Sequence, residues 1–347
     1  MEKTKLIPHL DGWRGIAISA VLIAHFCPRL NSSWIGELGV QLFFVLSGYL
    51  MSNLLFIKKV DLASFFWRRL ARVLPTFVLY VLTMAVYASI TGTPPQLDEI
   101  LATLTFLRTY LPAHIDIWNS GWAIGNLWSL NVEEHSYIYL AAVALIARWS
   151  SNKSTLLLLL AASIAAILTV LLYYPSHPPA GAANWDLRTE CAALGLIAAA
   201  TIRVVKHDFH FSMGRIESAI AIGSVIFAAL CYSTYQHKGV HLTMAPIALA
   251  IGINFLDKAP RLINALLSSR QLCWIGTCSF SVYLWQQPFY LAVKTGEIPE
   301  WLGFGIAMLI GVASYYLLEN PARKRLNQIQ PTIASKDSNI RLPAKQA

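Results

Sequence analysis

Charged side chains are scarce in this sequence. Asp, Glu, Lys and Arg make up 13% of its 347 residues, about half their share in an average soluble domain, whereas hydrophobic residues make up 56%. A soluble fold cannot bury that much apolar surface. Segments of about ten residues with alternating polar and apolar character are also missing, which excludes a membrane β-barrel. The fold class is therefore expected to be all-α, with the helices embedded in a lipid bilayer.

Motifs of several enzyme classes are missing as well. The sequence contains no G-x-S-x-G, no P-loop, no G-x-G-x-x-G and no H-E-x-x-H, which removes the main support for serine hydrolases, nucleotide-hydrolysing pumps, dinucleotide enzymes and zinc peptidases. The five cysteines show no C-x-x-C spacing, so we expect buried thiols and no metal site. The net charge of +9 lies in short loops between apolar runs, so it indicates membrane topology and no nucleic-acid partner.

Long apolar runs, in contrast, recur along the chain. Their length of about 17 to 22 residues is what a helix needs to cross about 30 Å of hydrocarbon. They predict a polytopic bundle of about ten transmembrane helices, at 12–28, 37–57, 73–91, 126–147, 155–174, 188–205, 216–235, 241–257, 275–293 and 301–319. Residues 1–327 would form one membrane domain. The polar, non-periodic segment 328–347 is expected to be a disordered tail.

The basic residues predict the orientation of this bundle. If the N-terminus lies in the cytoplasm, all but five of the 27 Lys and Arg residues fall on the cytoplasmic side. The five exceptions are Arg29, Arg108, Arg188, Lys238 and Lys294. The opposite orientation would invert this bias, so both termini are expected to be cytoplasmic.

Two connections differ from simple loops. Segment 61–74 places apolar residues on one side and arginines elsewhere, which is typical of a helix lying in the cytoplasmic membrane interface. Segment 93–125 is the longest external connection, and Trp118, Trp122 and Trp128 lie near its end. These tryptophans are either interfacial anchors or a platform on which a sugar stacks.

Two ionisable residues of the first predicted helix, Arg14 and His25, are the foremost functional candidates, because charges inside a membrane are costly. They are eleven positions apart in the sequence. In a helix, this spacing places His25 within about 20° of the face on which Arg14 lies, roughly 16 Å further along the axis. Arg14 would lie at the cytoplasmic end, paired with Asp11. His25 would lie past mid-membrane, where a neutral imidazole accepts a proton from a hydroxyl; a hydrogen-bonded core histidine is the alternative.

Six sequence blocks resemble a known family. They occur in order between Leu10 and Leu326, as LDGWRGIAISAVLIAHF, GVQLFFVLSGYLMS, FFWRRLARVLP, LWSLNVEEHSYIYL, CSFSVYLWQQPF and LENPARKRL. Their order and spacing resemble the acyltransferase-3 family of integral membrane acyltransferases. The resemblance implies a multi-pass enzyme of the bacterial inner membrane that transfers an acetyl or other short acyl group from acyl-CoA to a hydroxyl of a carbohydrate or lipid-linked glycan, such as O-antigen or exopolysaccharide. Acetyl-CoA would be a co-substrate, and no tightly bound cofactor is implied.

The resemblance also assigns site residues. The R-X10-H motif of the family falls on Arg14 and His25, its RXXR motif on Arg69 and Arg72, and its acidic motif on Glu133 and Glu134. His25, Glu133 and Arg14 would be catalytic, with His25 as the general base. Relatives with this motif set often carry an appended hydrolase-like domain, and none is expected in this chain.

Three of these positions also suit their roles physically. Arg69 and Arg72, three residues apart on one helix face, would clamp the phosphates of CoA through paired hydrogen bonds; contact with anionic lipid is the alternative. Glu133 would lie at the external mouth of the fourth predicted helix and orient either the acceptor hydroxyl or His25. An exposed carboxylate that complements the helix dipole is the alternative for Glu133.

Some positions depart from the family pattern. Gln286 and Gln287 stand where a histidine is frequent, so no catalytic role is expected there. His135 stands where glutamine is usual, and it is either a substrate contact or a polar helix residue. His177 is expected in a surface turn.

A second function class fits part of the pattern. Ten helices with a histidine in mid-membrane also suit a proton-coupled secondary transporter or exporter of acylated metabolites. No inverted repeat is found in the sequence, and paired arginines near the membrane interface favour a bound anionic cofactor over a transport path.

Overall fold

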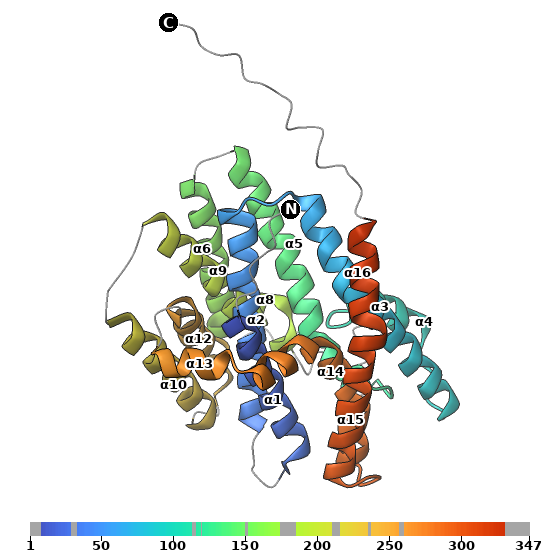
Figure 1. The fold of residues 1–347 in the computed structure, drawn as a ribbon. Coiled ribbons are helices and arrows are strands. Elements are labelled where there is room, and N and C mark those ends of the chain that lie inside the picture. The colour runs from blue at the N-terminus through green and yellow to red at the C-terminus, as the bar shows by residue number, and fades with distance from the viewer. Residues whose placement is uncertain are drawn as a thin grey trace, which may run out of the picture.

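The chain is all-helical where its structure is described. The computed structural model describes residues 8–28, 33–112, 116–118, 120–149, 152–173, 185–209, 216–234, 237–256 and 260–329, and these ranges contain no strand (Figure 1). The predicted all-α class is therefore confirmed. His177 and most of the predicted tail, residues 330–347, lie outside the described residues.

Five described helices are long and apolar enough to cross a membrane. They are Ser33–Ile57, Leu62–Ile90, Ser154–Tyr173, Ile216–Thr234 and Glu300–Gln328. The chain is thus a multi-pass membrane protein. The other predicted spans have helical counterparts that are shorter or more polar, so their crossing of the bilayer stays a prediction, as does the cytoplasmic location of the two termini.

Every predicted span has a counterpart among the observed helices. The longer ones are α1 (Pro8–Phe26), α2 (Ser33–Ser52), α3 (Leu62–Ile90), α5 (Trp128–Trp149), α6 (Asn152–Leu168), α9 (Leu194–Asp208), α10 (Ile216–Thr234), α12 (Met244–Asn254), α14 (Arg270–Lys294), α15 (Glu300–Ser314) and α16 (Asn320–Gln328). The shorter ones are α4 (Leu97–Leu104), α8 (Thr189–Ala192), α11 (Lys238–Leu242) and α13 (Arg261–Leu267). Single π-helical turns extend α2 through Asn53–Ile57 and α6 through Thr169–Tyr173, and another joins α15 to α16 through Tyr315–Glu319.

The predicted interfacial helix at 61–74 does not exist as a separate element. It forms the beginning of α3, a single helix of 29 residues that continues past Pro75. Asp61 caps this helix, since its Oδ2 accepts a hydrogen bond from the Ser64 amide at 2.8 Å. The arginines suggested a surface helix, but the side chain of Arg69 is only 12% exposed. The prediction is wrong because the beginning of α3 packs into the bundle.

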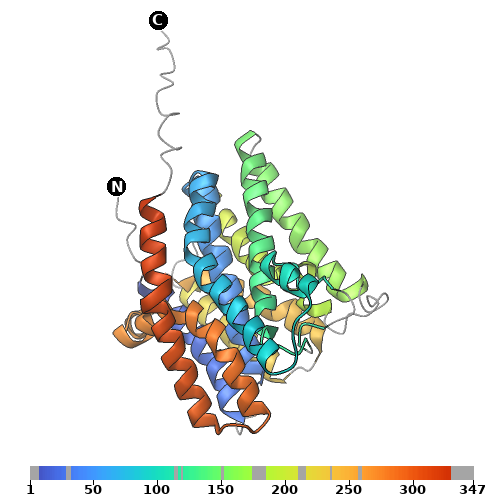
Figure 2. The same ribbon diagram turned by 90° about the vertical axis from the view of Figure 1, so that its right-hand side faces the viewer.

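The basic segments and His25 lie toward opposite ends of the molecule. The beginning of α3 and α16 lie side by side at the upper end in Figures 1 and 2, where the Trp67 indole Nε1 donates a hydrogen bond to the Leu326 carbonyl oxygen at 2.9 Å. Helix α1 runs down to the lower end and finishes one residue after His25. A functional path between the arginines and His25 must therefore run along the bundle.

Glycines allow α1 and α14 to pack with their backbones in near contact. A Cβ at Gly276 of α14 would lie 1.8 Å from the Asp11 carbonyl oxygen of α1, and a Cβ at Gly15 of α1 would lie 2.3 Å from the Leu272 carbonyl oxygen of α14. No side chain fits at either position without separating the helices. Because Arg14 lies one turn beyond Asp11, this contact also fixes Arg14 relative to α14.

Replacing Gly276 by alanine is therefore expected to destabilise the protein. Overpacking of this kind costs about 1–3 kcal/mol, and it should lower the thermal unfolding midpoint of the detergent-purified protein. Gly305→Ala on α15 is the matched control, since a Cβ there would meet nothing within 4 Å. Equal midpoints for the two variants would contradict the close packing of α1 on α14.

The cysteines are free thiols. All five lie in described residues and none forms a disulfide there. Cys191, Cys231 and Cys278 are buried, as predicted, whereas Cys27 is exposed.

Candidate functional site

Two adjacent cavities lie among α1, α2, α5 and α14. We call the first, of about 100 Å³, the arginine cavity; its polar lining comprises Arg14, Ser47, Arg69, Arg72, Ser129, Glu133, Tyr137, Ser279 and Tyr283. We call the second, of about 390 Å³, the histidine cavity; its polar lining includes His25, Glu37, Gln41, Asn126, Asp186, Lys238, His241, Tyr283 and Gln287. Val40 and Tyr283 line both cavities, so the two spaces meet at these side chains.

The cavities follow one another along the helices. On α14, Phe280 lines the arginine cavity, Tyr283 lines both, and Gln287 and Tyr290 line the histidine cavity. Spacings of three or four residues place these side chains on one face of the helix. Helix α2 shows the same succession, and the cavities are therefore stacked along the length of the bundle.

Helix α1 contributes one ionisable residue to each cavity. Arg14 lines the arginine cavity and His25 lines the histidine cavity. Because α1 is one continuous α-helix from Pro8 to Phe26, the two residues keep the predicted spacing on one helix face, roughly 16 Å apart along the axis. The predicted pairing of Arg14 is also confirmed, since its Nη1 lies 3.4 Å from Asp11 Oδ1.

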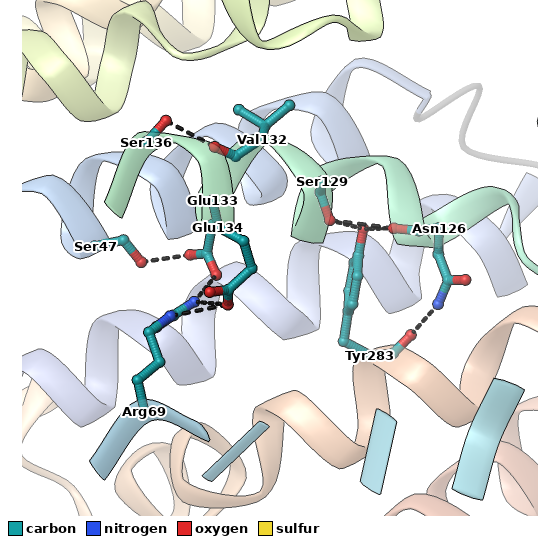
Figure 3. A network of polar contacts seen from close by, with 9 residues as sticks. All are labelled: Ser47, Arg69, Asn126, Ser129, Val132, Glu133, Glu134, Ser136 and Tyr283. Carbon is teal, nitrogen blue, oxygen red and sulfur yellow. Dashed lines mark hydrogen bonds and ion pairs between the residues drawn. The ribbon is translucent and has the colours of Figure 1, made fainter. Parts of the chain in front are cut away.

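Arg69 is held by two carboxylates of α5. Its Nη2 lies 3.1 Å from Glu133 Oε2 and 2.8 Å from Glu134 Oε1 (Figure 3). Its guanidinium also lies 3.5 Å from the centre of the Tyr137 ring. Ser47 of α2 donates a hydrogen bond to Glu133 Oε1 at 2.5 Å. The guanidinium of Arg69 is therefore engaged by protein groups and helps to fix α3 against α5.

The predicted position of Glu133 is wrong in consequence. We expected Glu133 at the external mouth of the fourth predicted helix, where it would orient either the acceptor hydroxyl or His25. It lines the arginine cavity instead and is ion-paired with Arg69. The physical reason is that a charge buried in a bundle needs an opposite charge nearby, and α3 carries Arg69 into the interior, where Glu133 meets that need.

Arg72 differs from Arg69 in its partners. Within the part of the chain that the structure describes, Arg72 makes no hydrogen bond and no ion pair, although it lines the arginine cavity. Arg14 and Arg323 repel it electrostatically, and Glu319 attracts it. A guanidinium that faces a cavity with unused donors suits an anionic ligand, because charge-assisted hydrogen bonds to such a ligand are strong.

His25 is oriented by a glutamine of α14. Its Nδ1 lies 2.5 Å from Gln286 Oε1, and Gln286 Nε2 donates to the Tyr283 carbonyl oxygen at 3.4 Å. Because an amide oxygen only accepts hydrogen bonds, Nδ1 of His25 carries the proton and Nε2 keeps its lone pair. The ring of Tyr290 stacks on the imidazole, with centroids 4.0 Å apart. His25 is thus held in the tautomer that a base requires.

Gln286 is the residue that the sequence reasoning missed. We expected no catalytic role at this position and considered Glu133 as one residue that could orient His25. The signal in the sequence was a glutamine within an apolar span, because a polar group inside a membrane bundle needs a partner. The structure shows that its side chain is fully buried. The amide of Gln286 satisfies this need by contacting His25.

The remaining wall of the histidine cavity is polar and aromatic. His241 Nδ1 lies 2.9 Å from Glu37 Oε2, and Lys238 Nζ lies 2.8 Å from Asp186 Oδ2. Two of the three candidate tryptophans, Trp118 and Trp128, line this cavity. The third, Trp122, is 6% exposed and packs in the core. The sugar-stacking hypothesis therefore stays open for the first two and is wrong for Trp122.

His135 lies outside both cavities. Its Nδ1 is 2.8 Å from Thr189 Oγ1, and the amide of Thr189 donates to the Tyr110 hydroxyl at 3.0 Å. Tyr110 in turn donates to Glu190 Oε2 at 2.5 Å. This network joins α5 to α8 and favours the interpretation of His135 as a polar helix residue.

Comparisons with known proteins identify the family of this chain. A family model described as an acyltransferase domain matches residues 7–319. The peptidoglycan O-acetyltransferase OatA of Listeria monocytogenes is 27% identical over 92% of this chain and 56% of its own length. The putative peptidoglycan O-acetyltransferase YrhL of Bacillus subtilis is 26% identical over 92% and 55%, and the O-acetyltransferase OatA of Staphylococcus aureus is 27% identical over 94% and 58%. The chain thus spans little more than half the length of these relatives. No solved structure matches it significantly.

Proposed function

Because the chain belongs to the acyltransferase domain family, we propose that it is a membrane O-acetyltransferase that moves an acetyl or other short acyl group from acyl-CoA to a hydroxyl of a cell-envelope carbohydrate. The names of two relatives make peptidoglycan the first acceptor to test, ahead of O-antigen and exopolysaccharide. The bacterial inner membrane is the proposed location, since acyl-CoA is cytoplasmic.

The succession of the two cavities carries this proposal. The arginine cavity offers Arg72, which has no ion-pair or hydrogen-bond partner among the described residues, to the phosphates of CoA, with Arg14 beside it. The histidine cavity offers Nε2 of His25 to a hydroxyl. The acyl-pantetheine arm would extend from the first cavity toward the second and bring the thioester to His25.

These positions support the following reaction. Nε2 of His25 takes the proton of the acceptor hydroxyl, and the oxygen attacks the thioester carbonyl carbon. The C–S bond then breaks, the ester remains on the carbohydrate, and the thiolate of CoA takes the proton back from His25. An acetyl-imidazole intermediate on His25 is the alternative route, and it would trap labelled acetyl on the protein when no acceptor is present.

Glu133 acts in this scheme as a positioning residue. Together with Glu134 it holds Arg69, and the hydrogen bond from Ser47 fixes its own carboxylate. This places α2, α3 and α5 around the donor site. The catalytic role that the family resemblance implied for Glu133 is thus restated as support of the arginine cavity.

The proposal is tested first in cells. Deletion of the gene should remove alkali-labile acetyl groups from one envelope glycan, as measured by mass spectrometry of isolated peptidoglycan and polysaccharide fractions. Return of the gene should restore them. Unchanged acetylation of every fraction after deletion would contradict the proposed function.

Gln286→Leu is expected to lower kcat by roughly tenfold to a hundredfold, because the imidazole of His25 loses the partner that selects its tautomer. The KM for acyl-CoA should stay unchanged, since Gln286 does not line the arginine cavity. Steady-state kinetics on membranes with each variant measures both constants. Gln271→Leu, at an exposed position of the same helix, is the matched control and should behave like the wild type. A wild-type kcat for Gln286→Leu would contradict the claim that Gln286 selects the tautomer of His25.

A further inference from the structure

Tyr283 stands between the two cavities. It is a bulky side chain that lines both of them, and only the smaller Val40 of α2 shares this position. On the proposed function, on which this inference rests, the acyl group must pass from the arginine cavity to the hydroxyl beside His25. It therefore passes Tyr283 and Val40.

Tyr283 is held at its hydroxyl and at its backbone carbonyl oxygen. Its hydroxyl donates to the Asn126 carbonyl oxygen at 3.0 Å and lies 2.8 Å from Ser129 Oγ, as Figure 3 shows. The side-chain amide of Asn126 also donates to the backbone carbonyl oxygen of Tyr283 at 2.8 Å. The edge of the ring contacts Phe43, with centroids 6.3 Å apart. The phenol ring thus spans from α14 to the beginning of α5 and is not free to swing.

A fixed ring at a narrow junction discriminates between acyl groups by their length. Packed interiors yield little, so each additional methylene forced past the ring must displace it or break its hydrogen bonds. A surplus methylene in an apolar site typically changes a rate by about ten- to two-hundredfold. The walls next to the ring on the arginine side are apolar and aromatic, including Phe43, Phe44 and Phe280, and they leave little space for a longer chain.

We propose that Tyr283 is the specificity-determining residue that restricts the donor to acetyl and excludes longer acyl groups, from butyryl upward. Its ring, held between α14 and α5, forms the junction that an acetyl group passes and a longer acyl chain does not. The hydroxyl holds the ring in place, and the size of the ring limits the length of the acyl chain that passes.

The test compares acyl donors. Membranes from cells that carry each variant are freeze-thawed to expose both faces, then supplied with radiolabelled acetyl-CoA or butyryl-CoA, and alkali-labile label in the glycan fraction is measured. The ratio of butyryl to acetyl transfer should rise at least about tenfold in Tyr283→Ala. It should rise less in Val40→Ala, which widens the same junction from α2.

Two control variants test whether the size of the Tyr283 ring alone changes the ratio of butyryl to acetyl transfer. Tyr283→Phe keeps the ring and should keep the wild-type ratio. Tyr139→Ala removes a ring from α5 that lines neither cavity, and its ratio should also be unchanged. If Tyr283→Ala does not fold, the transfer ratio of Val40→Ala tests the proposed junction.

Several results would overturn the inference. One is a wild-type enzyme that transfers butyryl as well as acetyl; another is an unchanged ratio in both junction variants that still transfer acetyl. Absence of any transfer by the wild type would instead contradict the proposed function, so the two failures are distinguishable.

Discussion

Replacing His25 by alanine is expected to abolish acyl transfer while acyl-CoA still binds. The imidazole Nε2 is the base that the histidine cavity offers, and loss of a general base lowers a rate by about 10²- to 10⁴-fold. Binding of the donor should persist, because His25 does not line the arginine cavity. The measurements are alkali-labile acetyl on the glycan and direct titration of the purified variant with CoA.

A matched control is available on α9. His207 is exposed, lies 3.0 Å from Asp208 Oδ1 through its Nδ1 and lines neither the arginine nor the histidine cavity, so His207→Ala should transfer acetyl groups normally. A His25→Ala variant that is well folded and keeps more than about a tenth of the wild-type rate would rule out general-base catalysis by this residue.

Arg72→Ala is expected to raise the KM for acyl-CoA by about ten- to a hundredfold. Charge-assisted hydrogen bonds of a guanidinium to phosphate contribute about 1.5–3 kcal/mol, and Arg72 has no protein partner among the described residues to which these donors are committed. The kcat should change little, since Arg72 lies away from His25. Arg72→Lys should recover only part of the loss, because an ammonium group cannot make paired hydrogen bonds.

Arg68 provides the control for this prediction. It lies one turn before Arg72 on α3 but is exposed and lines neither cavity. Arg68→Ala should leave the KM unchanged in low and high salt. Equal effects of the two substitutions would favour the alternative in which these arginines only contact anionic lipid.

Much of this architecture could be predicted from local sequence properties. Apolar runs of membrane length predicted the helices, and the i, i+3 spacing predicted the pair of Asp11 and Arg14. The common face of Arg14 and His25 followed from helical periodicity alone. These features depend on a single helix and its solvent, which the sequence describes directly.

The partners of the buried polar groups could not be predicted in this way. Glu133 and Arg69 are separated by 64 positions, and Gln286 and His25 by 261, so only the packing of whole helices decides that they meet. The prediction of where α3 begins failed for a related reason. Arginines and Pro75 are typical of a helix boundary at the membrane surface, but carboxylates on α5 make it favourable to bury Arg69.

The central claim is that acyl-CoA gives up its acyl group at this protein. The most direct measurement uses acetyl-CoA that carries one isotope in the acetyl group and another in the adenine ring. The purified protein is reconstituted in vesicles with peptidoglycan fragments as acceptor, and both isotopes are followed. We predict that the acetyl isotope appears as an alkali-labile ester on the glycan while the adenine isotope stays behind as free CoA. Movement of both isotopes together into the vesicles, without an ester, would contradict acyl transfer and indicate a carrier.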